Sequence, residues 1–250
     1  MSGIRFFDCR ALIGRRTVRD RKEPYETARL LEDMSYFRIK ETLVHHASSK
    51  EYDPVSGNRA VLAEIDGSPR LHGTFALLPA ATREQGDAAE AVGQMLASGC
   101  RAAWMWPKKQ AFPMGEAACG SVLSELEEHR VPLFLETTEV SLGQAASICA
   151  AHPDLPVIST HVGYRSLREL YAIWERHKNH HVDTSMQTTH SGLEDACPRF
   201  GAERFLFGTN WPFFTPGAAV AHVMYARISD EDKAKIAGGN LRRLLEEVRP

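Results

Sequence analysis

The sequence predicts an α/β fold, a (β/α)8 TIM barrel that forms a single domain over residues 1–250. Two observations indicate this fold. Eight short apolar runs alternate with helical patterns along the chain, and several of the runs end in one polar or titratable residue. Alternation favours parallel strands, and eight such units in 250 residues fit a closed barrel. A doubly wound open sheet is the alternative, although it usually has fewer strands.

The expected strands are short, as buried parallel strands usually are. We place them at residues 4–9, 39–44, 71–78, 100–106, 131–136, 156–161 and 181–185, and in the run that opens the segment 204–212. Helical patterns occur at 58–65, 85–98, 166–177 and 240–247, and another opens at Pro24. Ser229 is a typical N-cap for a further helix, which we expect to end at Gly238 and Gly239.

The composition is ordinary for a soluble protein, with 43% hydrophobic residues, 25% charged residues and a net charge of −2. No basic tract indicates nucleic acid, and no apolar stretch approaches the roughly 20 residues that span a membrane. The five cysteines are widely spaced and form no CxxC pair, which favours a reducing compartment. Because no signal peptide is recognisable, we expect a cytoplasmic protein.

Residues at the C-terminal ends of barrel strands meet at one mouth, where catalytic sites are usually built. Asn210 is the first candidate, because it follows an apolar run that breaks at Gly208 and precedes Pro212. The other strand ends supply Arg10, His45 or His46, Trp104 or Trp106 with Lys108, Glu136, His161, and Asp183 or Ser185. Histidine, glutamate and arginine in one mouth can shift each other's pKa and exchange protons.

Each candidate also has a purely structural explanation. His161 could be a hydrogen-bonded core histidine, and Glu136 could form an ion pair with Arg10. Trp104 and Trp106 share one face of a strand, which favours packing over binding. Solvated surface positions are the simplest explanation for Lys108, Lys109, His180, His181 and His190.

Five segments together resemble a known family. Residues 7–14 stand where that family has Asp-x-His-x-His-x-Gly, and residues 131–136 stand where it has a proline-bearing strand that ends in histidine. Residues 156–163 match a strand ending in His-x-Gly, and residues 201–212 are similar to Gly-x-x-Arg-hydrophobic-Gly-Ser/Thr-Asp-x-Pro. Residues 236–245 are similar to a closing Asn-x-x-x-Leu helix. Over nearly its whole length the chain therefore resembles the amidohydrolase superfamily, in its amidohydrolase-related (amidohydrolase 2) branch.

The resemblance implies a metal site that this sequence does not reproduce. Family members typically hold one or two divalent metals, and the matching positions here are Arg10, Leu12, Glu136, His161 and Asn210. Only His161 fits that pattern, since leucine cannot bind a metal and arginine stays protonated and repels one. Asn210 cannot serve as the family's aspartate base. We therefore expect no cofactor, and an Arg10–Glu136 ion pair in place of the metal.

The same resemblance implies a hydrolase. Its substrate would be a small molecule of the carboxylate or lactone type, or an amide. Arg10 would bind a carboxylate or stabilise an oxyanion, His161 or Glu136 would activate water, and Asn210 would donate to the carbonyl. The residues expected to bind substrate are His45, His46, Trp104, Trp106, Lys108 and Trp211. Decarboxylation of an aromatic or dienoic acid also occurs in the branch, but it usually needs the metal and ranks lower.

Two alternatives stay open. An enzyme with a reduced ligand set could hold zinc or manganese through Glu136, His161 and one of His45 or His46. A catalytically inactive barrel could bind a small molecule, or only pack. The expected partner is a small-molecule substrate rather than nucleic acid or a membrane. The resemblance also makes a homodimer possible.

Overall fold

The computed structural model describes residues 3–18 and 20–250. Nine parallel strands form within the described residues, in two sheets of order β1-β2-β3 and β4-β5-β6-β7-β8-β9. They are β1 (Phe6–Ile13), β2 (Ile39–His46), β3 (Leu71–Gly73), β4 (Phe75–Ala76), β5 (Ala103–Trp104), β6 (Leu133–Glu136), β7 (Val157–Thr160), β8 (His180–Asp183) and β9 (Phe205–Leu206). Each expected apolar run overlaps one of these strands or, at 71–78, contains two of them.

Strands β3 and β4 occupy a single position in the ring and are divided at Thr74. The Thr74 N–H donates back to the carbonyl of Val44 on β2 at 2.9 Å, whereas the Phe75 N–H donates forward to Ala102 at 3.0 Å. The chain therefore changes its hydrogen-bonding partner at this residue without leaving the ring. Counting β3 and β4 together gives the eight strand positions of a TIM barrel.

The ring closes between its first and last strands. The Cys9 N–H on β1 donates to the carbonyl of Phe207 at 2.8 Å, and the Leu12 N–H donates to Trp211 at 2.9 Å. Because the segment that follows β9 hydrogen-bonds to β1, no edge is left open on this side of the barrel. The predicted (β/α)8 barrel is therefore confirmed.

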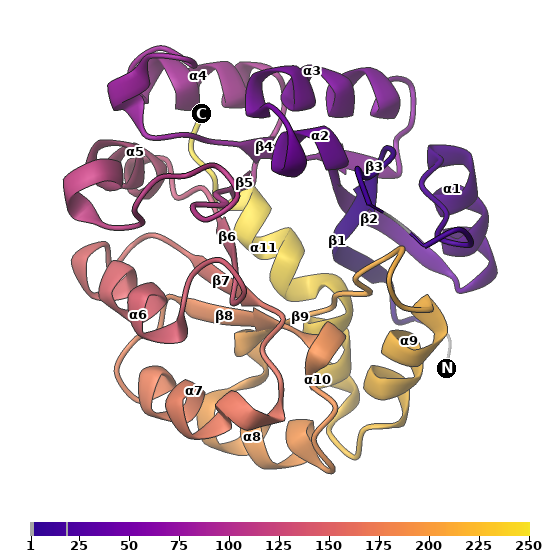
Figure 1. The fold of residues 1–250 in the computed structure, drawn as a ribbon. Coiled ribbons are helices and arrows are strands. Elements are labelled where there is room, and N and C mark those ends of the chain that lie inside the picture. The colour runs from indigo at the N-terminus through magenta and orange to yellow at the C-terminus, as the bar shows by residue number, and fades with distance from the viewer. Residues whose placement is uncertain (1–2, 19) are drawn as a thin grey trace.

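Helices surround the strands in Figure 1. Their bounds are α1 (Thr27–Tyr36), α2 (Ala47–Glu51), α3 (Pro54–Ile65), α4 (Ala88–Ala97), α5 (Glu116–Glu128), α6 (Leu142–Ala151), α7 (Leu167–Trp174), α8 (Gly192–Phe200), α9 (Pro216–Tyr225), α10 (Asp230–Ala234) and α11 (Asn240–Glu246). Among the described residues, no helix combines the length and the apolar character needed to cross a membrane.

The end of the chain differs from the sequence prediction. Ser229 does cap α10, since its Oγ accepts from the Asp232 N–H at 3.0 Å. Gly238 and Gly239 do not end the helix, however, because they lie in a π-helical turn (Lys235–Gly239) that continues into α11. A Cβ atom at Gly238 would lie 2.7 Å from the carbonyl oxygen of Arg5. Glycine is therefore needed there for close contact with the start of β1 rather than for a helix stop.

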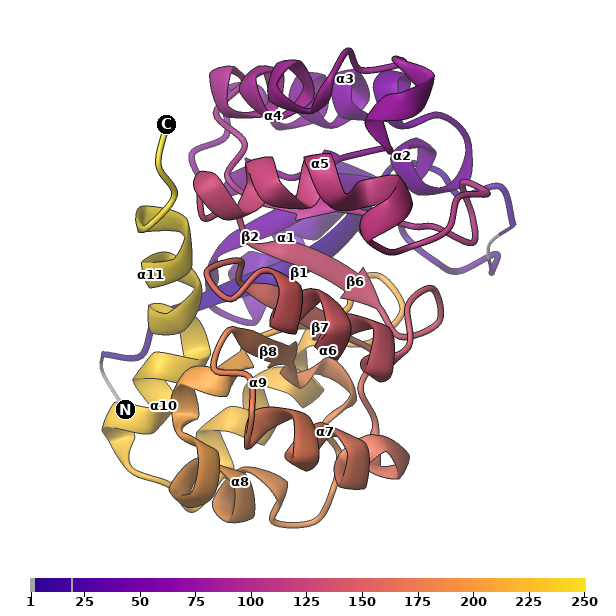
Figure 2. The same cartoon turned by 90° about the vertical axis from the view of Figure 1, so that its left-hand side faces the viewer.

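Helix α11 closes the end of the barrel opposite to the strand C-termini. In Figure 2 the β6 arrowhead points away from α11, which lies on the opposite side of the molecule. Its Leu241 and Leu244 pack with Phe7, Trp104 and Phe134 in a cluster that fills the barrel interior. The strand C-termini are thus the free end of the barrel, on which a site can form.

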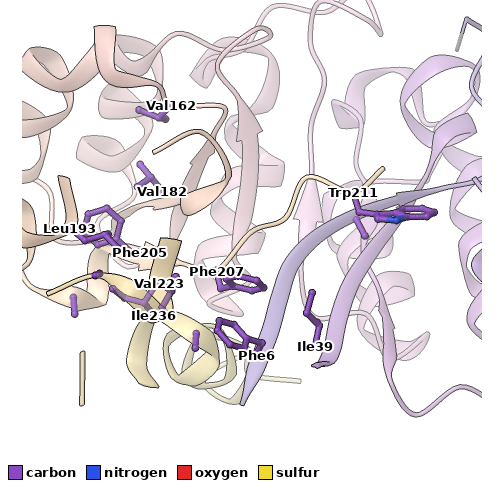
Figure 3. Close-up of a cluster of buried hydrophobic side chains, with 14 of the residues drawn as sticks. Phe6, Ile39, Val162, Val182, Leu193, Phe205, Phe207, Trp211, Val223 and Ile236 are labelled. Atoms are coloured by element: carbon purple, nitrogen blue, oxygen red, sulfur yellow. The ribbon is translucent and has the colours of Figure 1, made fainter. Parts of the chain in front are cut away.

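A second hydrophobic cluster joins the strands to the outer helices (Figure 3). Phe6 of β1 and Phe207 meet with ring centroids 4.6 Å apart, which packs the two segments that close the ring against each other. Val182 of β8, Val223 of α9 and Ile236 belong to the same cluster. This packing fixes the loop after β9, which carries Asn210, relative to β1, which carries Arg10.

The surface assignment of His180 and His181 was wrong, although His190 is exposed as expected. His180 is fully buried on β8, its Nε2 lies 2.8 Å from the Ser159 hydroxyl, and burial lowers its pKa to about 3. His181 is 6% exposed, its Nδ1 lies 2.9 Å from the Glu203 carbonyl, and burial lowers its pKa to about 4. Both side chains therefore act as neutral core residues.

Candidate functional site

The strand ends converge on a cavity of about 260 Å³ at the mouth of the barrel. Its lining includes residues from β1, β2 and β6, from the loops after β7 and β9, and from α2. The strand-end residues are Arg10, Leu12, His45, Glu136, His161 and Asn210, and the others are Arg16, Ala47, Lys50, Glu51, Lys109, Thr138 and Phe213. All four residues predicted to be catalytic therefore lie together, on or just after strands that are far apart in the sequence.

Arg10 is buried at the base of this cavity, with 2% of its surface exposed. Its Nη2 donates to the Asn210 Oδ1 and lies 3.0 Å from the His161 Nε2, while its Nη1 lies 3.2 Å from the His161 Nδ1. Its Nε is 3.7 Å from the Asp183 carboxylate. The guanidinium thus holds Asn210, His161 and Asp183 around one charge.

His161 faces Arg10 with both ring nitrogens, but only one of those contacts can be a hydrogen bond. A neutral imidazole has one acceptor nitrogen, and its other nitrogen carries a proton. Burial and the adjacent Arg10 charge lower the pKa of His161, so the neutral form is favoured near pH 7. In this arrangement the imidazole lone pair is directed at the guanidinium.

The backbone at the site is constrained at two positions. His161 has a φ of 61° and Asn210 a φ of 55°, a left-handed region that non-glycine residues seldom adopt. The His161 N–H donates to Asp183 Oδ1 at 3.2 Å, and the Asn210 side chain accepts from Arg10. Such strain is typical of functional sites, because the surrounding bonds must hold it in place.

Glu136 pairs with Lys50 rather than with Arg10, which corrects the expected ion pair. The Lys50 Nζ lies 2.8 Å from Oε1 and 2.7 Å from Oε2 of the carboxylate. The Trp106 indole N–H and the Thr138 hydroxyl also donate to Glu136, each at 3.2 Å. Although burial raises the pKa of Glu136, the charges of Lys50 and Arg10 outweigh it and lower the value to about 2. Glu136 is therefore ionised at neutral pH.

His45 lines the cavity as a neutral imidazole. Burial lowers its pKa to about 3, with the nearby Lys50 and Arg10 charges acting in the same direction. Its ring centroid lies 5.0 Å from that of Trp104 and 5.5 Å from that of Trp106. Within the described part of the chain its Nδ1 has no hydrogen-bond partner. His45 is thus a polar group at the cavity wall whose hydrogen-bonding capacity is not used.

Asp8 lies behind the site, on β1, and is 2% exposed. It accepts hydrogen bonds from the Thr209 N–H at 2.9 Å, from the Thr209 hydroxyl and from the Arg10 N–H at 3.1 Å. Burial is the largest influence on its pKa, which rises to about 7 despite these donors. The carboxyl group ties β1 to the loop that carries Asn210.

Two of the residues predicted to bind substrate are packed away from the cavity. Trp104 and Trp106 are fully buried and stack with centroids 5.2 Å apart and an interplanar angle of 7°. Trp106 reaches the site only indirectly, through its hydrogen bond to Glu136. The structural explanation for this pair, packing on a shared face, agrees with their position.

Three more of them, His46, Trp211 and Lys108, also lie outside the cavity lining. His46 caps α2, with its Nδ1 accepting from the Ser48 N–H at 3.2 Å. Trp211 is 2% exposed, and its indole N–H donates to Asp33 at 2.9 Å beside a separate groove. Lys108 is exposed and its ammonium donates to the Thr138 carbonyl at 2.6 Å, while the adjacent Lys109 lines the cavity instead. No contact with the cavity is seen for Lys108 or His46.

Sequence reasoning missed Lys50, which is the nearest cation to Glu136. Lys50 lies on α2, a five-residue helix directly after β2 that the sequence pattern did not predict. The available signal was its place, since the loop after a barrel strand supplies residues to the mouth. Arg16, which lies at the rim between Glu23 and Glu51, was missed for the same reason.

Two curated proteins match parts of this chain. An alignment over 122 residues is 29% identical to gamma-resorcylate decarboxylase of Rhizobium radiobacter, and it covers 41% of this chain and 37% of that enzyme. A further match, 44% identical over 48 residues, covers 19% of this chain and 21% of a Bacillus subtilis 4'-phosphopantetheinyl transferase. The chain thus aligns with well under half the length of either curated relative.

Solved structures match over almost the whole chain. A 2,6-dihydroxybenzoate decarboxylase complexed with 2,6-dihydroxybenzoate superposes with a TM-score of 0.74 at 18% identity, covering 98% of this chain and 100% of that one. A dihydroxybenzoic acid decarboxylase from a Polaromonas species gives 0.76 at 17% identity, with coverage of 100% and 98%. The 5-carboxyvanillate decarboxylase of Novosphingobium aromaticivorans gives 0.77 at 12% identity, with coverage of 98% and 96%. At these identities the likeness shows the fold.

The expectation that no cofactor is involved is corrected by these comparisons. The Polaromonas decarboxylase contains bound manganese, and the Novosphingobium enzyme is complexed with manganese. A divalent metal is therefore typical of the proteins that this chain resembles, and an expectation drawn from four substituted positions was too strong.

The side chains described here do not form a ready donor set for such a metal. Among residues 3–18 and 20–250, no group of three or more histidine, cysteine, aspartate or glutamate side chains could hold a metal ion. The Arg10 guanidinium stands against both nitrogens of His161, and Lys50 engages both oxygens of Glu136. Glu136 and His161 thus each already face a cation, and the residues present do not fit a bound divalent metal.

The family assignment rests on the sequence match itself. The family model described as amidohydrolase matches residues 53–246, which is most of the chain. The match includes Glu136, His161 and Asn210 and leaves out β1 with Arg10. The chain belongs to the amidohydrolase family.

Proposed function

We propose that this chain is an enzyme that binds a small aromatic carboxylate in the mouth of the barrel. The observation that carries this proposal is the charge of the cavity lining. Four basic side chains, Arg10, Arg16, Lys50 and Lys109, face two acidic ones, Glu51 and Glu136. An excess of positive charge in a confined, partly buried cavity favours an anionic ligand.

The cavity volume and the relatives support the same substrate class. About 260 Å³ suits a ligand with a single ring better than a large one. The similar proteins are named for gamma-resorcylate, 2,6-dihydroxybenzoate and 5-carboxyvanillate, all of them aromatic carboxylates. We therefore take decarboxylation as the first reaction to test. In that reaction the bond between the ring and the carboxylate breaks, its electron pair stays on the ring carbon, a proton from solvent adds there, and carbon dioxide leaves.

A second reaction is favoured by the contact between Arg10 and His161. A neutral imidazole can act as a general base, and a guanidinium beside it can stabilise the oxyanion that forms when water attacks an ester or lactone. Glu136 suits the role of base less well, because its pKa of about 2 makes it a weak proton acceptor. The substrate must first draw Arg10 away from the imidazole lone pair for this reaction to occur.

The test is a direct assay of the purified chain. We would incubate it with 2,6-dihydroxybenzoate, with and without added manganese, and measure loss of the acid and release of carbon dioxide. A parallel assay would follow hydrolysis of carboxylate-bearing lactones. The variant His161→Asn should lose activity in either assay, whereas Lys108→Met, which changes an exposed side chain outside the cavity, should keep it.

The same protein would be titrated with benzoate by calorimetry. Binding of benzoate that is lost at high salt agrees with a cationic carboxylate site. Absence of both turnover and carboxylate binding, with and without manganese, would contradict the proposal and favour a barrel without catalytic function.

A further inference from the structure

We propose that Lys50, and not Arg10, is the side chain that contacts the anionic oxygen of the substrate and selects for it. This inference rests on the proposed carboxylate function and names the residue responsible. Both cations line the cavity, but they differ in whether an N–H donor is left unused by the protein. The hydrogen-bond partners of the two side chains show this difference.

The Arg10 side chain is engaged by other residues of the protein. Its side chain is 3% exposed, and it is directed at Asn210, at both ring nitrogens of His161 and at Asp183. These contacts hold strand ends that come from β1, β7 and the loop after β9. A ligand that recruited Arg10 would therefore have to break contacts that maintain the site.

Lys50 is anchored but accessible. Its side chain is 22% exposed, and its ammonium donates to the two oxygens of Glu136. An ammonium has three N–H donors, so one is left after the carboxylate is satisfied. Within the described residues no third acceptor for Lys50 is found. That remaining proton is available to a ligand.

Glu136 fixes the position of the ammonium before any ligand arrives. The carboxylate is 4% exposed and is held by Trp106 and Thr138 in addition to Lys50. Lysine has a flexible stem, and ordering it costs conformational entropy that would otherwise weaken binding. Because Glu136 has already ordered Lys50, the ligand meets a preorganised donor.

The charge at the base of the cavity is suited to one anionic group. Arg10 and Lys50 contribute two positive charges and Glu136 one negative charge, while His45 and His161 are neutral because their pKa values are lowered. The sum over these lining groups is one positive charge. Asp183 lies behind Arg10, fully buried and outside the cavity lining, and it offsets part of the Arg10 charge, which leaves Lys50 as the more available cation.

The remaining basic residues of the lining are less suited to this role. Arg16 is engaged by Glu23 at 2.9 Å and by Glu51 at 3.2 Å, and it lies over the Phe213 ring. Lys109 is exposed at the rim, where its ammonium is well solvated and attracts anions only weakly. Its neighbour Lys108, which lies outside the cavity lining, serves as the matched lysine control.

The experiment compares benzoate with benzamide, which has the same ring and no charge. Calorimetric titrations would use the natural protein, Glu136→Gln, and the double variant Lys50→Met with Glu136→Gln. The double variant removes one positive and one negative charge, so its local net charge equals that of the natural protein. It also avoids leaving Glu136 buried and unpaired, which would threaten folding.

We expect the double variant to bind benzoate at least about tenfold more weakly than Glu136→Gln does, a difference of about 1.4 kcal/mol. Benzamide binding should change less than about twofold between the two, and Lys108→Met should change benzoate binding by less than about threefold. Equal benzoate affinity in Glu136→Gln and the double variant would overturn the role of Lys50. Failure of the natural protein to bind benzoate at all would instead overturn the proposed function.

Discussion

The ammonium of Lys50 lies 2.7 and 2.8 Å from the two carboxylate oxygens of Glu136, although the residues are 86 positions apart. The pair joins the helix that follows β2 to the end of β6 across the mouth of the barrel. Glu136 is nearly buried and Lys50 is 22% exposed, so water screens the interaction only in part. Loss of one partner should therefore be much more harmful than loss of both.

We expect Lys50→Met to lower the free energy of unfolding by about 3 kcal/mol, because it leaves a buried carboxylate unpaired. Glu136→Gln should cost less, and the double variant should be more stable than Lys50→Met alone. Urea denaturation of the four proteins would give the coupling energy directly. Additive losses, with no recovery in the double variant, would show that the pair is not coupled.

The sequence predicted the barrel because parallel strands are buried on both faces and appear as short apolar runs. The run 131–136 ends in Glu136 and the run 156–161 in His161, and both side chains face the mouth as expected. Helix α2 was not predicted, because the strand before it ends in His46 and the helix has only five residues. Local periodicity cannot reveal an element of that length.

The pairing within the site could not be read from the sequence. Arg10 was the obvious partner for Glu136 by charge, yet the closed ring places it against His161 and Asn210. Which cation meets which anion depends on how strands far apart in the chain are arranged around the ring. The burial of His180 was missed for a related reason, since its partner Ser159 lies on the neighbouring strand.

The two stacked tryptophans should respond differently to the same substitution. The Trp106 indole N–H donates to Glu136 at 3.2 Å, whereas the Trp104 indole nitrogen is buried without a partner among the described residues. Trp106→Phe loses a hydrogen bond to a charged group in addition to packing, so it should cost about 1.5–3 kcal/mol more than Trp104→Phe. Thermal or urea unfolding of the two variants tests this, and equal losses would show that the bond to Glu136 adds nothing.

Asp8 should make stability depend on pH. Burial raises its pKa to about 7 in the folded protein, whereas the unfolded value is near 3.8. The folded state therefore holds the proton more tightly, and this contribution to stability is complete below about pH 4 and is lost as pH rises through about 7. Compared with Asp8→Asn, the natural protein should lose up to about 4 kcal/mol between pH 4 and pH 8.

The pH profile of the natural protein must be compared with that of Asp8→Asn, because buried histidines such as His180 change stability with pH in the opposite sense. Their folded pKa values are lowered, so their contribution grows as pH rises toward about 6.5. Urea midpoints at pH 4 and pH 8 would be measured for each protein. Parallel pH profiles for the natural protein and Asp8→Asn would show that Asp8 does not titrate in this range.

Gly208 is needed for space rather than for backbone freedom. A Cβ atom there would lie 2.7 Å from Asp183 Oδ2 and 3.2 Å from the Cys9 sulfur. Asp183 is fully buried and holds the His161 N–H, so it cannot move aside at low cost. Gly208→Ala should lower stability by about 1–3 kcal/mol and reduce activity. Gly93→Ala is the control, since nothing lies within 4 Å of its Cβ position in α4 and helix propensity should make it neutral or stabilising.

Five positions in the cavity correspond to those where the family holds its metal ligands. Arg10, Leu12, Glu136, His161 and Asn210 all line one cavity, so their side chains can reach a common point. The variant Arg10→His, Leu12→His, Glu136→His and Asn210→Asp replaces a cation and an apolar group with ligands that divalent metals accept. It should bind manganese at least about tenfold more tightly than the natural sequence, or by about 1.4 kcal/mol. Calorimetric titration with manganese, together with elemental analysis after dialysis, would measure the difference. Equal affinity in the two proteins would show that the natural side chains already supply a complete site, and that the contacts of Arg10 with His161 and of Lys50 with Glu136 open when the metal binds.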